Sequence, residues 1–286
     1  MSVSMTEYKP SQNLVPYVEF FWDGQFNINQ ESLLSQKVVP NGYIELIIHT
    51  SELHCHLSKH GLWSSSPDYT IIGLFTSPYE VRFRDKVNVF GIRFKPEAIY
   101  NLFGIPASEF YQQYEDMELV LGTDFQLFCS KLREAKTIEN KIEHAETYLI
   151  QSLQRQKKPL TYVNHAAEII RNTHGFIQVE ELYHKVFISL RQLQRQFKIK
   201  VGISPKMYMR ISRLNAVQQL LEEKGLLNYT HIAFICGYAD QAHFIRDFKS
   251  IIGERPGLFT TNSAEYIVNA NTAVNMESDD EFRTAE

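Results

Sequence analysis

The chain has 286 residues, of which 44% are hydrophobic and 22% are charged, and its formal net charge is -4. It is long enough to bury two ordinary cores. Its three cysteines, Cys55, Cys129 and Cys236, stand far apart without the spacing of metal ligands, so neither a disulfide framework nor a zinc site is indicated. No segment approaches the about 18 apolar residues of a membrane span, and the start is polar, so we expect a soluble cytoplasmic protein.

Charge is distributed unevenly along the chain. Residues 157–262 contain 15 Lys and Arg against 8 Asp and Glu, residues 1–156 contain 13 against 19, and residues 263–286 contain 1 against 6. A basic segment between acidic segments is typical of a domain that binds a polyanion while the rest of the chain does not. We therefore expect two domains, 1–156 and 157–262, followed by an acidic, disordered tail.

Residues 14–95 are predicted to form mainly β-strands. Aromatic and β-branched residues fill short segments that are separated by turn signals such as Pro40-Asn-Gly42. The candidate strands are residues 17–22, 43–49, 54–57, 69–75, 79–83 and 87–95. Several short strands at this spacing favour a small β barrel or sandwich.

Helices are predicted to follow over residues 96–104, 123–135 and 137–155. The third carries one narrow apolar stripe, made by Ile138, Ile142, Ala145, Leu149 and Leu153. Such a stripe packs either on the barrel of its own domain or on the same helix of a second subunit. The polar segment 154–159, which ends in a proline, is predicted to be the linker between the domains.

The stretch from Ser189 to Phe259 contains an internal repeat at a shift of 51 residues. The matched positions are Leu193, Arg195, Phe197, Lys198, Gly202, Pro205 and Tyr208 in the first copy and Phe244, Arg246, Phe248, Lys249, Gly253, Pro256 and Phe259 in the second. Self-similarity of this kind indicates a duplicated supersecondary unit. Each copy is predicted to be a helix, a tight turn and a second helix, which is the helix-turn-helix pattern.

The second helix of each copy presents an outward face that suits DNA. Because Leu193 and Phe197 face inward, helical geometry turns the polar residues between them outward. Arg and Gln read guanine and adenine edges in the major groove, whereas Lys and further Arg suit phosphates. The predicted DNA-contacting residues are Arg191, Gln194, Arg195, Lys198, Gln241, His243, Arg246 and Lys249. The alternative for any single one of them is a solvated helix face.

Two segments make the repeat specific. They are Ser189-Leu-Arg-Gln-Leu-Gln-Arg-Gln-Phe-Lys198 and Cys236-Gly-Tyr-Ala-Asp-Gln-Ala-His-Phe-Ile-Arg-Asp-Phe-Lys249, with one extra residue in the second turn. With them, residues 159–260 resemble the DNA-binding domain of the AraC family of bacterial transcription regulators. The resemblance implies two helix-turn-helix units in successive major grooves of double-stranded DNA. It also implies activation of transcription and RNA polymerase as a candidate partner.

A second resemblance covers part of the N-terminal region. The segments Leu14–Trp22, Pro40–Ile48 and Gly91–Pro96 resemble a poorly characterised N-terminal domain of one AraC subgroup. AraC-type regulators often carry a cupin-like barrel at this place. The resemblance therefore implies a sensing or dimerisation domain, with a small-molecule effector and a second copy of the chain as candidate partners.

Two candidate sites in the N-terminal region compete with ordinary packing. Aromatic walls with one charged group are typical of small-molecule pockets. The candidate effector-binding residues are Trp22, Tyr43, Trp63, Tyr79 and Arg93, and the alternative for each is barrel core or rim. A metal-binding strand face is suggested by Glu45, His49, His54 and His56. Since no carboxylate–histidine spacing repeats, we predict no metal, no cofactor and no catalytic residue.

The predicted fold is an α+β N-terminal domain, a small β barrel or sandwich plus helices, followed by an all-α DNA-binding domain with two helix-turn-helix units. The predicted function is that of a one-component transcription regulator, not an enzyme, controlled through the N-terminal domain by an effector or by dimerisation. One alternative is a metal-dependent barrel enzyme fused to a DNA-binding module. Another is a regulator whose N-terminal part is a protein-interaction module without a ligand.

Overall fold

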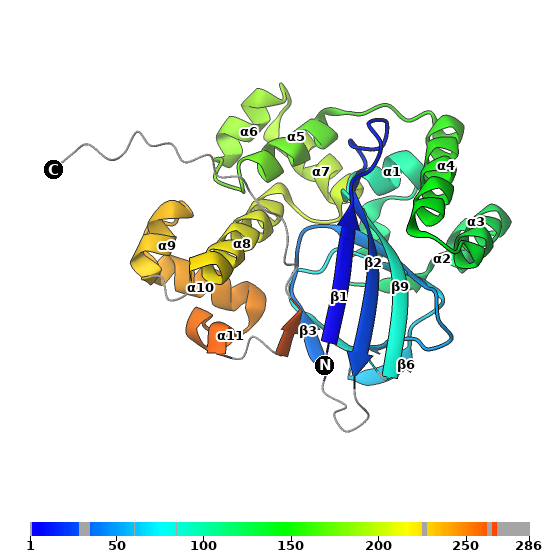
Figure 1. The fold of residues 1–286 in the computed structure, drawn as a ribbon. Coiled ribbons are helices and arrows are strands. Elements are labelled where there is room, and N and C mark those ends of the chain that lie inside the picture. The colour runs from blue at the N-terminus through cyan, green and yellow to red at the C-terminus, as the bar shows by residue number, and fades with distance from the viewer. Residues whose placement is uncertain are drawn as a thin grey trace.

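The computed structural model describes residues 2–28, 35–59, 61–83, 85–224, 228–261 and 265–267. Two β-sheets with covering helices make up the part before residue 157, apart from one sheet strand at residues 266–267. Helices make up residues 162–224 and 228–261 almost entirely (Figure 1). The predicted order of an α+β domain followed by an all-α domain is confirmed.

The larger sheet has the strand order β1-β2-β9-β4-β7-β10, and its neighbouring strands are antiparallel. Its strands are β1 (Ser2–Tyr8), β2 (Val18–Ile28), β4 (Ile44–His49), β7 (Tyr69–Ile72), β9 (Asp85–Phe94) and β10 (Tyr114–Asp116). Successive residues of a strand point to opposite faces. Phe21 and Ile92 therefore lie in the core under the helices, whereas Trp22 and Arg93 lie on the opposite face.

The smaller sheet has the order β11-β3-β8-β5-β6. Its strands are β3 (Gln36–Val38), β5 (His56–Lys59), β6 (Leu62–Ser65), β8 (Tyr79–Arg82) and β11 (Tyr266–Ile267). Apolar side chains of both sheets share one cluster, in which the rings of Phe26 and Phe83 stack at 4.2 Å between centroids. Over the described residues the sheets pack as a sandwich and do not close into a barrel.

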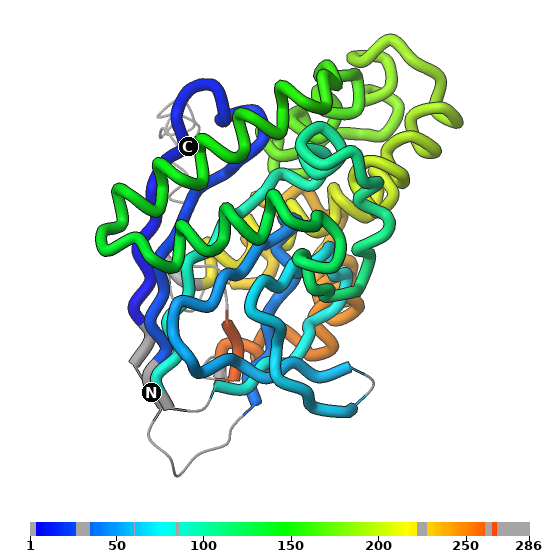
Figure 2. Tube along the Cα trace, turned by 90° about the vertical axis from the view of Figure 1, so that its right-hand side faces the viewer, coloured from blue at the N-terminus to red at the C-terminus, as the bar shows by residue number. Residues whose placement is uncertain are grey.

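Helices cover the other face of the larger sheet. They are α1 (Ala98–Phe103), the short 3-10 helix η1 (Ala107–Phe110), α2 (Met117–Leu121), α3 (Thr123–Glu134) and α4 (Ile138–Gln156). Figure 2 shows α3 and α4 crossing in front of the strands. Ala145 and Leu149, from the stripe of α4, are buried in the main core, and Ile142 packs against it. The stripe therefore packs on its own chain, which is the first of the two predicted alternatives.

The C-terminal helices form the predicted duplicated unit. They are α5 (Tyr162–Asn172), α6 (Val179–Lys185), α7 (Leu190–Val201), α8 (Pro205–Lys224), α9 (Tyr229–Ile235), α10 (Gln241–Ile252) and α11 (Pro256–Thr261). Ser189 and Asp240 cap α7 and α10 by accepting hydrogen bonds from backbone amides. Gly202 and Gly253 end these helices at φ of 96° and 90°, which a glycine adopts readily. The units α6–α7 and α9–α10 are joined by α8, whose 20 residues make it about 30 Å long.

The first unit shares its hydrophobic core with the N-terminal domain. Leu102 of α1 and Ala107 of η1 belong to the same buried cluster as Val163 of α5 and Leu193 of α7. The predicted linker is helical as far as Gln156, and only a short segment separates α4 from α5. The side-chain amide of Asn101 donates to the backbone oxygens of residues 158 and 159, at 3.2 and 3.1 Å, and so holds this segment on the domain.

A buried ion pair crosses the same boundary. The guanidinium of Arg171 on α5 donates to both carboxylate oxygens of Glu97, just before α1, at 2.6 and 3.1 Å. Arg171 also donates to the hydroxyl of Tyr208 on α8, at 2.9 Å. The side chain of Glu97 is 1% exposed, so its charge depends on this partner.

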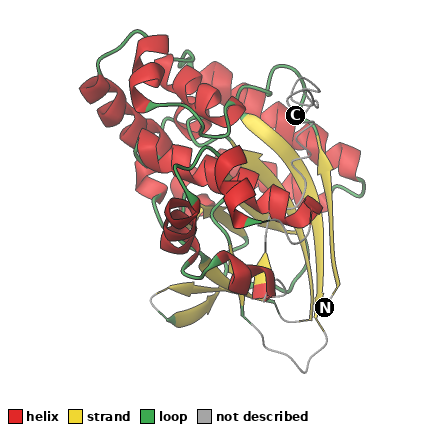
Figure 3. Cartoon of the chain, turned by 90° about the vertical axis from the view of Figure 1, so that its left-hand side faces the viewer, coloured by secondary structure: helices red, strands yellow, loops and turns green. Residues whose placement is uncertain are grey.

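The second unit is fastened to the smaller sheet (Figure 3). Strand β11, which follows α11, pairs in parallel with β3. The ammonium of Lys37 on β3 lies 3.2 Å from the carboxylate of Glu254, between α10 and α11. Tyr266 and Ile267, which belong to the tail expected to be disordered, form β11, and Tyr266 packs in the apolar cluster of the second unit. Residues 268–286 lie outside the described part of the chain. In the described chain, none of the helices has the length and apolar character needed to span a bilayer.

Replacing Arg171 with Gln should lower the free energy of unfolding by about 3–5 kcal/mol, because it leaves the carboxylate of Glu97 buried without a cation. Urea denaturation followed by circular dichroism measures the change. Lys185→Gln is the matched control: it breaks the exposed pair with Glu181, 3.4 Å apart, and should cost less than about 1 kcal/mol. Equal losses in the two variants would contradict the assigned role of Arg171.

Candidate functional site

Helix α7 presents an exposed basic face. Leu193 and Phe197 are fully buried, and between and beside them Arg191, Gln194, Arg195 and Lys198 are exposed. Among the described residues no carboxylate lies within 4.0 Å of the three cations on this face. A helix that holds several unneutralised cations beside an amide side chain matches the requirements of a DNA-reading helix.

Helix α10 presents a less polar face. Arg246 and Lys249 are exposed, as predicted. The side-chain oxygen of Gln241 accepts a hydrogen bond from the hydroxyl of Thr230 at 3.0 Å. The half-buried ring of His243 lies edge-on to the ring of Tyr238, with 5.3 Å between the centroids. Both side chains thus make contacts within their own unit. Helix α10 therefore presents fewer free polar groups to solvent than α7 does.

Two exposed phenylalanines on the helix-turn-helix units lie outside the predicted site. Phe187, in the turn of the first unit, is 95% exposed, and Phe234, on α9, is 82% exposed. Phe187 has φ of 53° and occupies the turn position that Gly237 holds in the second unit, where φ is 63°. A bulky residue in this left-handed region is strained. In the sequence, this strain is signalled by the absence of a glycine from the first turn.

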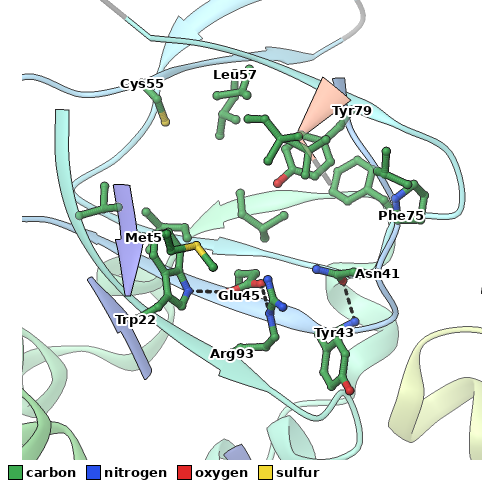
Figure 4. A pocket seen from close by; sticks show the side chains of 18 of the residues that line it. Met5, Trp22, Asn41, Tyr43, Glu45, Cys55, Leu57, Phe75, Tyr79 and Arg93 are labelled. Atoms are coloured by element: carbon green, nitrogen blue, oxygen red, sulfur yellow. Dashed lines mark hydrogen bonds and ion pairs between the residues drawn. The ribbon is translucent and has the colours of Figure 1, made fainter. Parts of the chain in front are cut away.

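A cavity of about 120 Å³ lies between the two sheets (Figure 4). Of the five predicted effector residues, Trp22, Tyr43, Tyr79 and Arg93 line it. Figure 4 shows the Tyr43 ring pointing away from Tyr79 across the cavity, so it contributes at the edge. Trp63 lies elsewhere: it belongs to β6, and the guanidinium of Arg82 lies 3.7 Å from the centre of its ring.

Glu45 connects two of these residues. One of its oxygens accepts from the indole N–H of Trp22 at 3.1 Å, and the other accepts from Nε of Arg93 at 2.5 Å. The indole lies across Gly91, where a Cβ atom would come 2.0 Å from the ring. A glycine at this position of β9 therefore allows Trp22 to form one wall of the cavity.

The described histidines of the N-terminal domain are not brought together with other side chains into a set of metal ligands. The part of the chain that the structure describes contains no group of three or more His, Cys, Asp or Glu side chains placed to hold a metal ion. Glu45 is paired with Arg93, and the rings of His49 and His54 stack with 4.3 Å between their centroids. The metal-dependent alternative therefore lacks a ligand set among these residues.

A buried cluster of Cys55, Ser66 and His49 adjoins the cavity. The hydroxyl of Ser66 lies 3.2 Å from the sulfur of Cys55 and 3.2 Å from Nε2 of His49. Burial raises the pKa of the Cys55 thiol to about 11, while burial and the neighbouring His54 lower the pKa of His49 to about 4. Near neutral pH both groups are uncharged, so this arrangement does not activate the thiol as a nucleophile.

Two family models match the chain. Residues 6–116 match a family described as a domain of unknown function, DUF6597, and residues 182–262 match a helix-turn-helix domain. The second match covers α7 to α10 with the whole of both turns, which are the elements that carry the exposed basic residues.

Curated relatives match over the C-terminal part. The transcriptional activator RhaS of Escherichia fergusonii is 38% identical over 77 residues, which cover 27% of each chain. The RhaS protein of Yersinia pestis is 35% identical over 81 residues, or 28% of this chain and 29% of the relative. The match thus spans less than a third of the length of these relatives.

Solved structures of regulators are similar to a lesser degree. A structure of ToxT from Vibrio cholerae is 10% identical with a TM-score of 0.45, over 84% of this chain and 98% of ToxT. The C-terminal domain of AraT, a response regulator from Geobacillus stearothermophilus, is 22% identical with a TM-score of 0.33, over 41% of this chain and 95% of that domain.

The stability of the fold should depend on pH through His49. Its pKa is about 4 in the folded state and about 6.5 in an unfolded chain, so the unfolded state takes up the proton first as the pH falls. Between pH 6.5 and 4 the folded state should lose about 3 kcal/mol through this group. Urea denaturation at several pH values should show this slope in the wild type and a smaller one in His49→Gln; identical slopes would contradict the assignment.

Proposed function

We propose that this chain, which carries an AraC-type helix-turn-helix domain over residues 182–262, is a sequence-specific DNA-binding transcription regulator. The observation that carries the proposal is the unneutralised basic face of α7, in a unit repeated by α9 and α10. In this proposal α7 and α10 enter successive major grooves, which the length of α8, about 30 Å, is suited to allow.

The proposed division of labour follows the predicted boundaries. Residues 1–156 sense an effector, residues 157–262 bind DNA, and residues 263–286 follow as an acidic tail. The cavity between the sheets supports an effector site that includes Trp22, Tyr43, Tyr79 and Arg93. Trp63 does not line the cavity and is left out of the proposed site. Because the relatives are named transcriptional activators, we propose activation, with RNA polymerase as the further partner and the bacterial cytoplasm as the compartment.

We also propose that the chain dimerises, through a surface other than the apolar stripe of α4. The stripe of α4 is occupied by the core of its own chain, so a second copy would bind elsewhere. Sedimentation of the purified full chain, with and without DNA, measures the number of subunits.

Selection from a random duplex library with the purified full chain should yield a preferred sequence. Affinity for it should fall on the order of 100-fold between 50 and 200 mM salt if the four cations assigned to phosphates, Arg195, Lys198, Arg246 and Lys249, each neutralise one. Fluorescence anisotropy at increasing salt measures the slope. A folded protein that retains no duplex at low salt would refute the proposal.

The two recognition helices should contribute unequally to specificity. Alanine at Arg191 and Gln194 should relax the preferred sequence, at about 1–3 kcal/mol for each bidentate pair of hydrogen bonds to a base that is removed. Alanine at Gln241 and His243 should change it less, because these side chains are engaged within their own unit. Repeating the selection with each double variant tests this. A preference that survives the first pair and disappears with the second would reverse the assignment.

Lys198 should act differently from Arg191. As a phosphate contact, Lys198→Ala should weaken binding about equally for all sequences and reduce the salt slope by about 1. Anisotropy with the selected duplex and with a scrambled duplex measures both effects. A weakening confined to the selected duplex would show that Lys198 contacts a base.

A further inference from the structure

The chemistry of the cavity between the sheets favours a neutral occupant. Most of its lining side chains are apolar, from Met5 on β1 to Ile267 on β11. The two charged groups in the lining, Glu45 and Arg93, form an ion pair and balance each other. A ligand with a net charge would leave water without a counter-charge, which is strongly unfavourable. A neutral ligand avoids that cost.

The size of the cavity limits the occupant further. Its volume is about 120 Å³. An apolar protein cavity of roughly 150 Å³ binds benzene. The space between the sheets therefore fits a single ring or a short branched chain. Aromatic side chains, among them Trp22, Phe75 and Tyr79, form much of the wall against which such a molecule would pack (Figure 4).

Strand β11 links this cavity to the second helix-turn-helix unit. Its two residues point to opposite sides, as strand geometry requires. Ile267 lines the cavity, whereas Tyr266 is 6% exposed and belongs to the core of the second unit, with its ring centre 4.6 Å from that of Phe259. The backbone amide of Val39, another lining residue, donates to the oxygen of Ile267 at 3.1 Å. A molecule that packs on Ile267 thus acts on the strand that fastens this unit.

A second contact leads from the cavity to α8. The side-chain amide of Asn215 on α8 donates to the backbone oxygen of Asn41, a lining residue, at 2.8 Å. The first unit is held differently, by the ion pair of Glu97 with Arg171, and neither residue lines the cavity. A ligand in the cavity is therefore expected to affect the placement of α8 and α10 more than that of α7.

We infer that the cavity binds a small, neutral, apolar molecule of about the size of one aromatic ring, and that β11 couples its occupancy to the placement of the second helix-turn-helix unit. The inference rests on the proposed function for its output, DNA binding. It adds the chemical class of the effector and the route by which the effector acts. A coupling of at least about five-fold in affinity is expected, and it is reciprocal between the ligand and DNA.

The ligand class is tested with toluene, benzoate and benzylammonium, which share a ring and differ in charge. The protein is the full chain with Trp63→Phe, which leaves Trp22 as its single tryptophan. Toluene should change the Trp22 fluorescence in a saturable way and raise the melting temperature, and the two ions should bind at least about ten-fold more weakly. Equal or tighter binding of either ion, or no response to toluene in both measurements, overturns the assigned class.

The coupling is tested with the selected duplex. Saturating toluene should change the DNA affinity of the wild type at least about five-fold. Tyr266→Ala keeps the cavity lining and removes the contact with Phe259, so toluene should still bind while the DNA affinity no longer responds. Ile267→Ala removes the side chain on the cavity side and should also reduce the response. Glu265→Gln, at an exposed neighbour, is the control and should respond as the wild type does.

The outcomes separate the two proposals. A protein that binds toluene but no duplex refutes the proposed function and leaves the ligand class supported. A protein that binds the duplex with the same affinity in saturating toluene overturns the coupling. An unchanged response in both Tyr266→Ala and Ile267→Ala overturns the role of β11.

Discussion

The arrangement of the molecule depends on the buried ion pair between Glu97 and Arg171. It joins the start of α1 to α5, and through the hydroxyl of Tyr208 it reaches the start of α8. Because both charges are removed from water, neither element can leave the other without exposing an unpaired charge or rehydrating it. The surrounding apolar cluster, from Phe94 in the sheet to Phe197 in α7, closes around this pair. Helix α7 is thus held as a fixed part of the N-terminal domain.

The second helix-turn-helix unit is attached to the N-terminal domain by weaker contacts than the first. Its contacts with the N-terminal domain include a two-residue strand, the partly exposed ion pair of Lys37 with Glu254, one hydrogen bond from Asn215 and the apolar contact of Val39 with the core of the second unit. Partly exposed ion pairs of this kind contribute little to stability. The cavity lies beside this lighter attachment, so in the coupling that we infer the placement of α10 relative to α7 is what responds to a ligand.

Local sequence signals predicted the DNA-binding part well and the sandwich in part. Caps, glycines and apolar spacing act within a few residues, so the helices around Ser189 and Asp240 could be placed from sequence. The central strands β2, β4 and β9 were predictable because their apolar content is high, whereas β1, β3 and β6 carry weak patterns and gain order from their neighbours. Composition singled out Trp22, Tyr43, Tyr79 and Arg93, but it also included Trp63, since the face on which a strand residue lies depends on pairing. Ile267 was beyond prediction because its partner strand lies at the other end of the chain.

The pairing of β11 with β3 has a consequence for synthesis on the ribosome. Tyr266 lies in register with Lys37, so the edge of β3 has no neighbour on that side until nearly the whole described chain has emerged. During that time the nascent sandwich carries an open strand edge beside an unfinished apolar wall, which is the kind of surface that associates with other chains. Release of a chain that stops before residue 266 would make that exposure permanent. The wall is therefore complete only in molecules in which the second helix-turn-helix unit has already been synthesised.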